Sequence, residues 1–405
     1  MTYKTIQLKK GKEESLKRFH PWIFSGAIQR MERGIEEGET VRVITSTGEF
    51  IAVGHYQIGS ITVRVLSFDD IAIDTDYWKK RLQSALEMRC RIGIADNPQN
   101  DTYRLVHGEG DGMPGLVIDC YGKTAVIQAH SVGIHICRKD IVKALVEIMG
   151  TRTENVYYKS ETTLPFKADI TSAETCPDEA NGLKNGFLYG GSNENTAIEN
   201  GLRFHVDWLH GQKTGFFVDQ RENRSLLEKY ANGKSVLNMF CYTGGFSVYA
   251  MRGNAEKVHS VDSSAKAVEL TNANIALNFP GDTRHKAICE DAFKYLEREG
   301  DKYDLIILDP PAFAKHRAAL KNALRGYTRL NVKAFEHIKR GGILFTFSCS
   351  QVVTKDNFRN AVFTAAAQAG RTVRILHQLH QPADHPINIY HPEGEYLKGL
   401  VLYVE

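Results

Sequence analysis

The chain has 405 residues, of which 42% are hydrophobic and 24% are charged, a balance that is typical of globular proteins and excludes wholesale disorder. Its 51 Lys and Arg against 48 Asp and Glu leave a net charge of +3, too small by itself to indicate a nucleic-acid partner. The 7 cysteines form no Cys-x-x-Cys pair, which argues against zinc and disulfide frameworks, and we predict no metal site.

Length and hydropathy bound the class of protein further. At about 150 residues per domain, the length predicts about three domains. The first residues contain no apolar signal region, and no uncharged stretch approaches the ~18 residues that cross a bilayer. We therefore expect a cytoplasmic protein without a membrane partner, either a monomer or a homodimer.

Short strand patterns separated by glycines fill the first part of the chain. Residues 40–44, 50–53 and 61–65 are apolar runs with turn signals between them, and this spacing predicts a small β-barrel or sandwich. Residues 1–34 carry eight Lys and Arg against three Glu, so positive charge collects at this end. We expect this end to form one of two phosphate-binding patches.

The middle of the chain combines a helix pattern with further strands. Apolar residues at near-helical spacing predict a helix over 76–92, and strand patterns follow at 116–118 and 125–127. Residues 176–200 are rich in Gly and Asn, which predicts a polar linker. The predicted domains are residues 1–73, residues 74–198 including most of the linker, and residues 199–405.

After the linker the pattern changes to alternating strands and helices. Helical patterns include residues 265–277 and 354–369, the second with Thr354 as its cap. Apolar runs between the helices cover residues 236–240, 258–261, 287–289, 305–308, 343–347, 373–376 and 400–404. This alternation predicts an α/β fold with a mostly parallel sheet and helices on both faces.

One glycine motif of the middle region is misleading. Residues 110–115 match the dinucleotide-binding pattern Gly-x-Gly-x-x-Gly. A working motif follows a strand and opens a helix, whereas Pro114 is followed here by a strand pattern. We therefore predict a turn at this place and no cofactor site.

A stronger candidate cofactor site begins at the first strand of the α/β region. Residues 236–240 lead into Gly244 and Gly245, which let a backbone approach a ligand closely. The next strands end in Asp262, placed for ribose hydroxyls, and Asp291, placed for an adenine amino group. Each Asp taken alone could instead cap the helix that follows. The predicted lining residues are Phe240, Tyr242, Thr243, Gly244, Gly245, Asp262, Ser263, Asp291 and Ala292.

The identity of the cofactor follows from what this site contains and lacks. Its motifs lie at the carboxyl ends of predicted strands, the edge at which open parallel sheets bind ligands. An acid for the ribose without a pyrophosphate-binding Gly-x-Gly-x-x-Gly favours S-adenosylmethionine over NAD, although ribose recognition is shared by both.

The fourth and fifth strands carry the candidate catalytic residues. The fourth ends in Asp309, and the fifth delivers Cys349, between two serines, to the same edge. A free cysteine is usually a small buried hydrophobe, but one at a ligand-facing strand end can act as a thiolate nucleophile. Its attack on C6 of a cytosine would make C5 able to accept a methyl group, while Asp309 stabilises charge on the ring. Phe313 is placed to stack on a flipped or single-stranded base.

Basic residues recur every four positions after the Asp309 loop, at Arg317, Lys321, Arg325, Arg329 and Lys333. Like charges at this spacing destabilise a helix, so RNA phosphate is the expected counter-charge, and a solvated helix face is the alternative. Gly326 predicts an interruption of this helix. The predicted substrate-binding residues are Pro310, Pro311, Phe313, Lys315, Arg317, Arg325 and Arg329.

With these residues assembled, the sequence resembles the RlmI-like family of bacterial 23S ribosomal RNA cytosine-C5 methyltransferases over essentially its whole length. The matching motifs are residues 8–11, 20–27, 103–106, 108–115, 118–119, 211–221, 240–247, 346–350, 383–386 and 393–399. The segment 160–200 departs most from the family.

The resemblance implies a fold, a cofactor and a substrate. The fold is a small β-barrel PUA domain, an α+β middle domain and a class I methyltransferase domain with a Rossmann-like seven-stranded sheet. The cofactor is S-adenosylmethionine, with Gln220 as a further contact, and the substrate is 23S ribosomal RNA.

Two other functions stay open from the residues themselves. A base-amine or guanine-N7 methyltransferase would use the same fold with Cys349 as a structural residue, because an Asp-Pro-Pro-aromatic loop needs no cysteine. A non-catalytic RNA-binding assembly factor would account for the barrel and the basic residues. The presence of Cys349 favours the C5 reaction.

Overall fold

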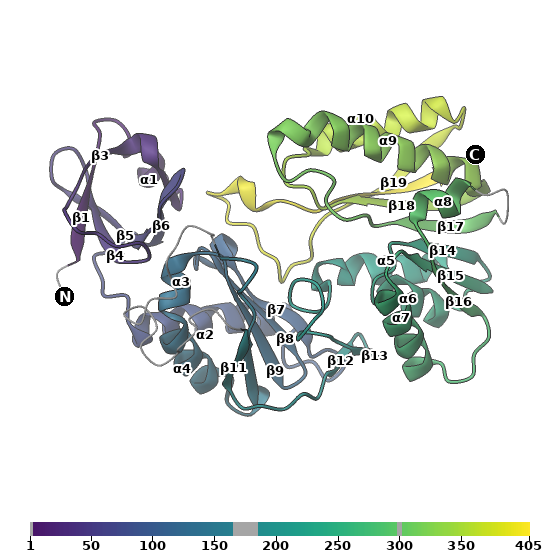
Figure 1. Cartoon of the computed structure of the whole chain (residues 1–405), viewed down its shortest axis with the longest axis horizontal. Coiled ribbons are helices and arrows are strands. Elements are labelled where there is room, and N and C mark those ends of the chain that lie inside the picture. The colour runs from purple at the N-terminus through teal and green to yellow at the C-terminus, as the bar shows by residue number, and fades with distance from the viewer. Residues whose placement is uncertain (1–2, 165–184, 298–301) are drawn as a thin grey trace. The chain divides into compact units, whose positions relative to one another are not determined.

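A computed structural model describes residues 3–164, 185–297 and 302–405 (Figure 1). Two compact units make up the chain. The first comprises residues 1–201, 206–218 and 383–394, and the second comprises residues 202–205, 219–382 and 395–405. Among the described residues, no helix combines the length and the apolar character that a membrane span requires.

The N-terminal part of the first unit is a curled six-stranded sheet (Figure 1). Its strands are β1 (Lys4–Leu8), β2 (Trp22–Phe24), β3 (Ile28–Met31), β4 (Thr40–Ile44), β5 (Phe50–Tyr56) and β6 (Ile61–Ser67), with the short helix α1 (Glu14–Lys17). The order is β2-β6-β5-β4-β1-β3. Alternate residues such as Val41 and Val43 are buried, as expected for strands with one face on a core, and the predicted small β-barrel is confirmed.

A second sheet in this unit is covered by helices. Its order is β11-β10-β9-β8-β7. The elements are α2 (Thr75–Arg91), β7 (Thr102–His107), β8 (Leu116–Tyr121), β9 (Thr124–Ala129), α3 (Val132–Ile136), α4 (Arg138–Met149), β10 (Asn155–Tyr158) and β11 (Gly186–Tyr189). Gly112 has a left-handed backbone and β8 follows it, so the misleading glycine motif is a turn, as predicted.

The predicted linker over residues 176–200 is wrong where the structure describes it. β11 pairs antiparallel with β10, and the ring of Phe187 packs on Tyr157 with centroids 5.1 Å apart. β12 (Thr196–Glu199) belongs to a two-stranded sheet. Composition misled here because β11 pairs with β10, which precedes the polar stretch, and because the Asn200-Gly201 turn that joins β12 to β13 (Leu202–His205) was not recognised. Residues 176–184 of the predicted linker lie outside the described residues.

The second unit is built on a seven-stranded sheet with the order β16-β15-β14-β17-β18-β20-β19, in which β20 runs antiparallel to both neighbours. The strands are β14 (Ser235–Met239), β15 (Lys257–Asp262), β16 (His285–Cys289), β17 (Tyr303–Leu308), β18 (Ile338–Ser348), β19 (Val373–Leu379) and β20 (Lys398–Val404), and β13 (Leu202–His205) lies outside this sheet. The predicted α/β fold is confirmed.

Helices cover both faces of this sheet (Figure 1). One face carries α5 (Arg221–Tyr230), α6 (Gly245–Arg252) and α7 (Ala265–Asn278), and the other carries α8 (Ala292–Glu297), α9 (Leu320–His337) and α10 (Lys355–Gln368). All residues of β14 are buried, which suits a central strand that is covered on both faces.

The strand order places the carboxyl ends of four strands side by side. The order reverses between β14 and β17, the point at which doubly wound sheets bind ligands. The register aligns Met239 with Val261 on one side and with Leu308 on the other, and Leu308 with Thr346. The loops that follow these strands therefore leave from one edge of the sheet.

Candidate active site

The loop after β14 turns sharply because several of its residues have a left-handed backbone, namely Phe240 (φ 60), Tyr242 (φ 48) and Gly244 (φ 74). This conformation costs a non-glycine residue roughly 1–2 kcal/mol, so neighbouring elements must hold it. The Tyr242 N–H donates to Asp262 Oδ2 at 3.0 Å, and Thr271 Oγ1 donates to the Tyr242 carbonyl at 2.9 Å. The loop is thus fixed by the end of β15 and by α7.

Packing within the protein leaves little room for a side chain at either of the paired glycines. A Cβ on Gly244 would lie 2.7 Å from Thr271 Cγ2, and one on Gly245 would lie 3.0 Å from Arg224 Cδ. The sequence analysis attributed both glycines to the approach of a ligand. The structure adds a nearer reason, which is that α7 and α5 lie against this loop. The neighbouring Thr243 is buried, and its carbonyl accepts from Asn274 Nδ2 at 2.8 Å.

The predicted ribose and adenine carboxylates both bind backbone N–H groups. Half-buried Asp262 accepts from Tyr242 through Oδ2 and from Ser264 N–H through Oδ1, the latter at 2.9 Å. Exposed Asp291 caps α8, because its Oδ1 accepts two N–H groups of the first turn, each at 3.0 Å. Carboxylate oxygens accept more than one hydrogen bond, so capping leaves capacity for a ligand. Of their predicted neighbours, Ser263 is exposed and Ala292 is buried.

Two strand ends bring the candidate catalytic residues together. Cys349 is half-buried, and its thiol donates to the Pro310 carbonyl at 3.9 Å, beside Asp309. Ser348 and Ser350 are buried, with Oγ atoms 2.9 and 3.2 Å from the Tyr327 hydroxyl. Burial raises the pKa of Tyr327, so this phenol stays neutral. The two serine hydroxyls therefore bind Tyr327 and hold the end of β18 in place. Neither of these hydrogen bonds is made to the thiol of Cys349.

Asp309 is held by an amide pair. Gln220 Nε2 donates to Asp309 Oδ2 at 3.0 Å. Gln220 is buried, and its Oε1 accepts from Asn223 Nδ2 at 2.6 Å, so its donor end faces the acid. The sequence analysis placed Gln220 at the cofactor, and the structure brings it to Asp309. Asn223 was missed, although a polar residue three positions after Gln220 on a helix was the available signal.

The Phe313 ring packs against α9 at a place where Gly326 leaves room for it. The ring of Phe313 packs on Tyr327, with centroids 4.6 Å apart, and a Cβ on Gly326 would lie 3.1 Å from it. The predicted interruption at Gly326 is wrong, because α9 runs unbroken from Leu320 to His337. Glycine is used here to seat an aromatic ring and not to end a helix. Of the prolines before Phe313, Pro310 is buried and Pro311 is exposed.

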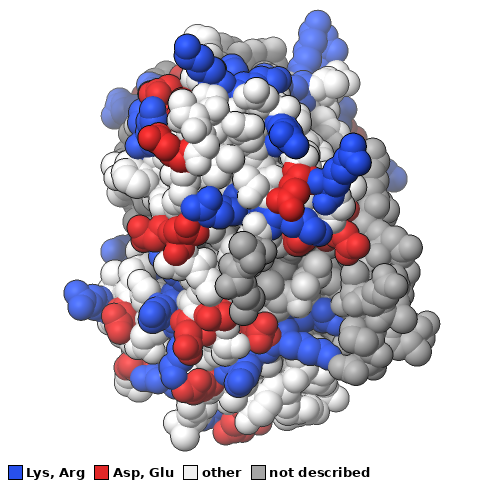
Figure 2. Space-filling model, turned by 90° about the vertical axis from the view of Figure 1, so that its left-hand side faces the viewer, with Lys and Arg blue, Asp and Glu red and all other residues white. Residues whose placement is uncertain are grey.

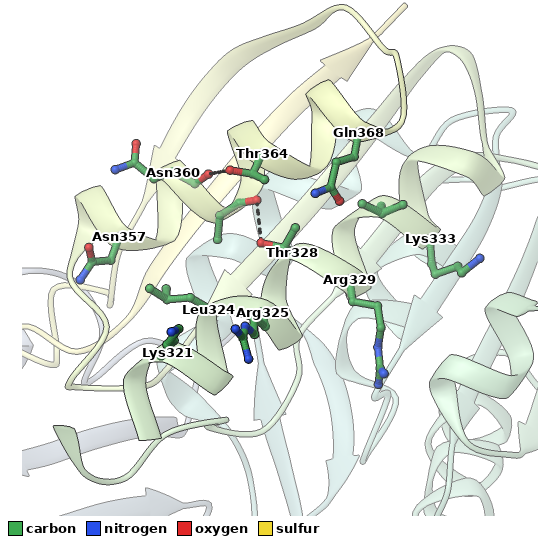
Figure 3. A pocket seen from close by; sticks show the side chains of 12 residues that line it. Lys321, Leu324, Arg325, Thr328, Arg329, Lys333, Asn357, Asn360, Thr364 and Gln368 are labelled. Carbon is green, nitrogen blue, oxygen red and sulfur yellow. Dashed lines mark hydrogen bonds between the residues drawn. The ribbon is translucent and has the colours of Figure 1, made fainter. Parts of the chain in front are cut away.

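A groove of about 700 Å³ lies between α9 and α10 (Figure 3). Lys321, Arg325, Arg329 and Lys333 line it from α9, and Asn357, Asn360, Thr364 and Gln368 line it from α10. No Asp or Glu is among its described lining residues. The predicted contacts Lys315 and Arg317 are exposed, precede α9 and do not line the groove. Most of the predicted basic row thus lines one groove. Lys333 also pairs with Glu336 at 3.0 Å, and the Arg329 guanidinium lies 4.2 Å from the centroid of the Phe293 ring.

The N-terminal end is less positive than residues 1–34 suggest. Lys4 pairs with Glu39 at 3.1 Å, and Lys17 pairs with Glu14 at 3.0 Å. Figure 2 shows a face on which Lys and Arg are interspersed with Asp and Glu. Acidic residues after residue 34, such as Glu39, lie on the same sheet as these cations. The surface expected to be a separate basic patch therefore carries both positive and negative side chains.

The other described cysteines differ from Cys349 in their surroundings. Burial raises the pKa of Cys90, and it raises those of Cys120, Cys137 and Cys241 to about 12. These thiols are therefore neutral near pH 7. Cys289 is exposed at the end of β16, and Cys176 lies outside the described residues.

Comparisons with known proteins give family matches in both parts of the chain. Residues 177–393 match the S-adenosylmethionine-dependent methyltransferase model, and residues 6–68 match a PUA-like domain. Ribosomal RNA large subunit methyltransferase I of Tolumonas auensis is 40% identical over 98% of each chain. The protein of that name from Escherichia coli O157:H7 is 38% identical over 98% of this chain and 99% of its own.

Solved structures share the fold. A Streptococcus mutans chain, named as a SAM-dependent methyltransferase, has a TM-score of 0.82 at 23% identity and 100% coverage of both chains. A second, named as a methyltransferase complexed with SAH, has the same TM-score of 0.82 and the same identity of 23%.

Proposed function

The chain belongs to the family of S-adenosylmethionine-dependent methyltransferases that includes ribosomal RNA large subunit methyltransferase I, and we propose that it methylates C5 of a cytosine in 23S ribosomal RNA. The observation that carries this proposal is the half-buried thiol of Cys349, which contacts the Pro310 carbonyl beside Asp309. A base-amine methyltransferase would need no thiol for its chemistry, and Cys349 would then be a structural residue.

In the proposed reaction the Cys349 thiolate attacks C6 of the cytosine, forming an S–C6 bond and moving the electron pair of the double bond toward C5. The carboxyl group of Asp309, held by Gln220, would be protonated in this step and would donate its proton to N3, which neutralises the negative charge that builds up on the ring. It would regain that proton when the adduct breaks down. When the C5 proton is lost to a base, the C5–C6 double bond re-forms and Cys349 leaves as a thiolate.

The residues at the ends of β14 and β15 fit the cofactor of this family. A tight loop with left-handed residues lies beside the Asp262 carboxylate, an acceptor suited to ribose hydroxyls. We assign Phe240, Tyr242, Asp262 and Asp291 to this site. When bound, S-adenosylmethionine would supply an electrophilic methyl group to C5, and the broken S–CH3 bond would leave S-adenosylhomocysteine.

A 23S transcript that contains 5-fluorocytidine in place of cytidine tests the reaction class. Fluorine cannot leave C5 as a proton does, so the wild-type enzyme with S-adenosylmethionine should remain bound to the RNA through Cys349 on a denaturing gel. Methylation of ordinary transcript without any adduct on the fluorinated one would instead favour a base-amine or guanine-N7 reaction. Failure to bind S-adenosylmethionine by calorimetry would favour the non-catalytic assembly factor.

We further assign the α9/α10 groove to the phosphates of this RNA, with Arg325 and Arg329 as contacts. Its row of cations begins after the Asp309 loop, so an RNA strand that leaves the reacting base would meet them next. The groove offers donors from both helices and no carboxylate among its described lining residues. We assign the N-terminal domain, residues 1–73, to RNA capture and residues 199–405 to catalysis, with residues 74–198 as the α+β middle domain between them.

Replacing Arg325 and Arg329 together by alanine should weaken binding of unmodified 23S transcript. The logarithm of the association constant for RNA falls linearly with the logarithm of the salt concentration, and each lost phosphate contact should make this slope less negative by about 0.7. Filter binding at several salt concentrations measures the slope. The matched control is Lys229→Ala with Lys234→Ala, two exposed lysines that lie outside the groove, and it should leave the slope unchanged. Equal slopes for both double variants would remove the groove from the RNA path.

A further inference from the structure

Lys398 is a buried cation on the strand next to the candidate nucleophile. It begins β20, lies opposite Ser348 in the antiparallel register with β18, and is 5% exposed. Its Nζ donates to the Ser350 carbonyl oxygen at 2.7 Å. Because Ser348 and Ser350 flank Cys349, the ammonium lies at the backbone that carries the thiol.

This ammonium has no permanent counter-charge in the described part of the chain. The charged groups that face it are Glu395 and Lys355, and these two form an ion pair with each other at 2.5 Å. The remaining titratable neighbour of Lys398 is Cys349. Burial lowers the pKa of Lys398 to about 8, which reflects the cost of a cation that lacks a paired carboxylate.

We propose that Lys398 is a positioning residue for methyl transfer, whose ammonium stabilises the thiolate of Cys349. When the thiol ionises, the S–H bond breaks, the electron pair stays on sulfur and the proton goes to water. The buried ammonium then faces a negative charge, so an ion pair replaces an unpaired cation. This inference rests on the function proposed above, in which Cys349 is the nucleophile.

Two other titratable groups surround the thiol and bear on its ionisation. Tyr327 is neutral and hydrogen-bonded to the flanking serines, so it adds no charge. Asp309 precedes the Pro310 carbonyl that the thiol contacts, and its carboxylate opposes a second negative charge nearby. A cation on the other strand is therefore what the thiolate requires.

The pH dependence of alkylation tests this inference without RNA or cofactor. Full-length protein is treated with iodoacetamide, and mass spectrometry follows the tryptic peptide 341–355, which contains Cys349 as its single cysteine. In the wild type, the midpoint of the rate profile should lie below that of a free cysteine in a peptide. Lys398→Met should raise the midpoint by about one pH unit, which lowers the rate at pH 7 about tenfold.

Conservative and matched variants separate charge from packing. Lys398→Arg keeps the cation and should restore most of the wild-type rate. Lys339→Met removes a lysine at the other end of β18, where it binds Asp304, and should leave the midpoint unchanged.

Several outcomes would overturn the inference. One is a wild-type midpoint at or above that of a free cysteine, which needs no folded variant to be measured. Another is an unchanged midpoint in folded Lys398→Met. If the fluorocytidine adduct still forms in that case, the positioning role fails while the proposed function stands. A missing adduct in the wild type contradicts the function itself.

Discussion

Cys349→Ala is expected to lower methylation of 23S transcript by at least about 10³-fold, because it removes the atom that forms the bond to C6. The affinity for S-adenosylmethionine should stay within twofold of the wild type, since the cofactor loop follows β14 and is held by Asp262 and Thr271. A methyl-transfer assay with radiolabelled cofactor and calorimetry with the same cofactor measure the two quantities. The fluorocytidine adduct should be absent.

Cys90→Ala is the matched control for this loss. Cys90 is also half-buried, but it lies on α2 in the other unit, and its thiol donates to Asp96 at 3.3 Å. The substitution should leave turnover and adduct formation unchanged. Turnover of Cys349→Ala within a few-fold of the wild type would refute the nucleophile assignment. The reaction would then belong with the base-amine methyltransferases, which use the same Asp-Pro-Pro-aromatic loop.

Much of the α/β unit follows from local apolar patterns. The predicted runs 236–240 and 305–308 correspond to β14 (Ser235–Met239) and β17 (Tyr303–Leu308), because continuous apolar residues between turn signals mark a buried strand. The prediction for β18 began too late, at residue 343. The strand starts at Ile338 and passes through Gly341, which has a φ of 79.

The predictions for Gly326 and Gln220 were wrong or incomplete for the same physical reason. The role of each residue depends on a contact with a residue elsewhere in the sequence. Gly326 does not break α9, because Phe313, thirteen positions earlier, fills the space beside it. The role of Gln220 depends on Asp309, which lies 89 positions away. Neither pairing leaves a local signal in composition or periodicity.

Lys398 illustrates the same limit at the candidate site. In the sequence it is one lysine before an apolar run, and it matched a family motif without any role. Its significance comes from strand pairing, which sets it opposite Ser348 and brings Nζ to the Ser350 carbonyl. Sequence reasoning found the thiol because a cysteine at a strand end is visible in the chain, but it could not find the charge beside it.

Asp309→Asn should lower kcat by about 10²–10³-fold, the range for loss of one group that stabilises developing charge. Asparagine keeps the shape and can still accept from Gln220 Nε2, as Asp309 Oδ2 does at 3.0 Å. It cannot transfer a proton to N3 of the cytosine, so the step that builds negative charge on the ring slows. The KM for RNA should change less than threefold, because the basic groove is intact.

The fluorocytidine adduct separates this loss from that of Cys349→Ala, since the nucleophile is still present in Asp309→Asn. The adduct should therefore form with Asp309→Asn, but slowly, and its yield should approach the wild-type level after long incubation. Asp282→Asn is the matched control, because Asp282 is paired with Arg284 in a loop away from the candidate site and should turn over normally. If Asp309→Asn matched that control, ring charge would have to be stabilised by another group, and Gln220 would lose its positioning role as well.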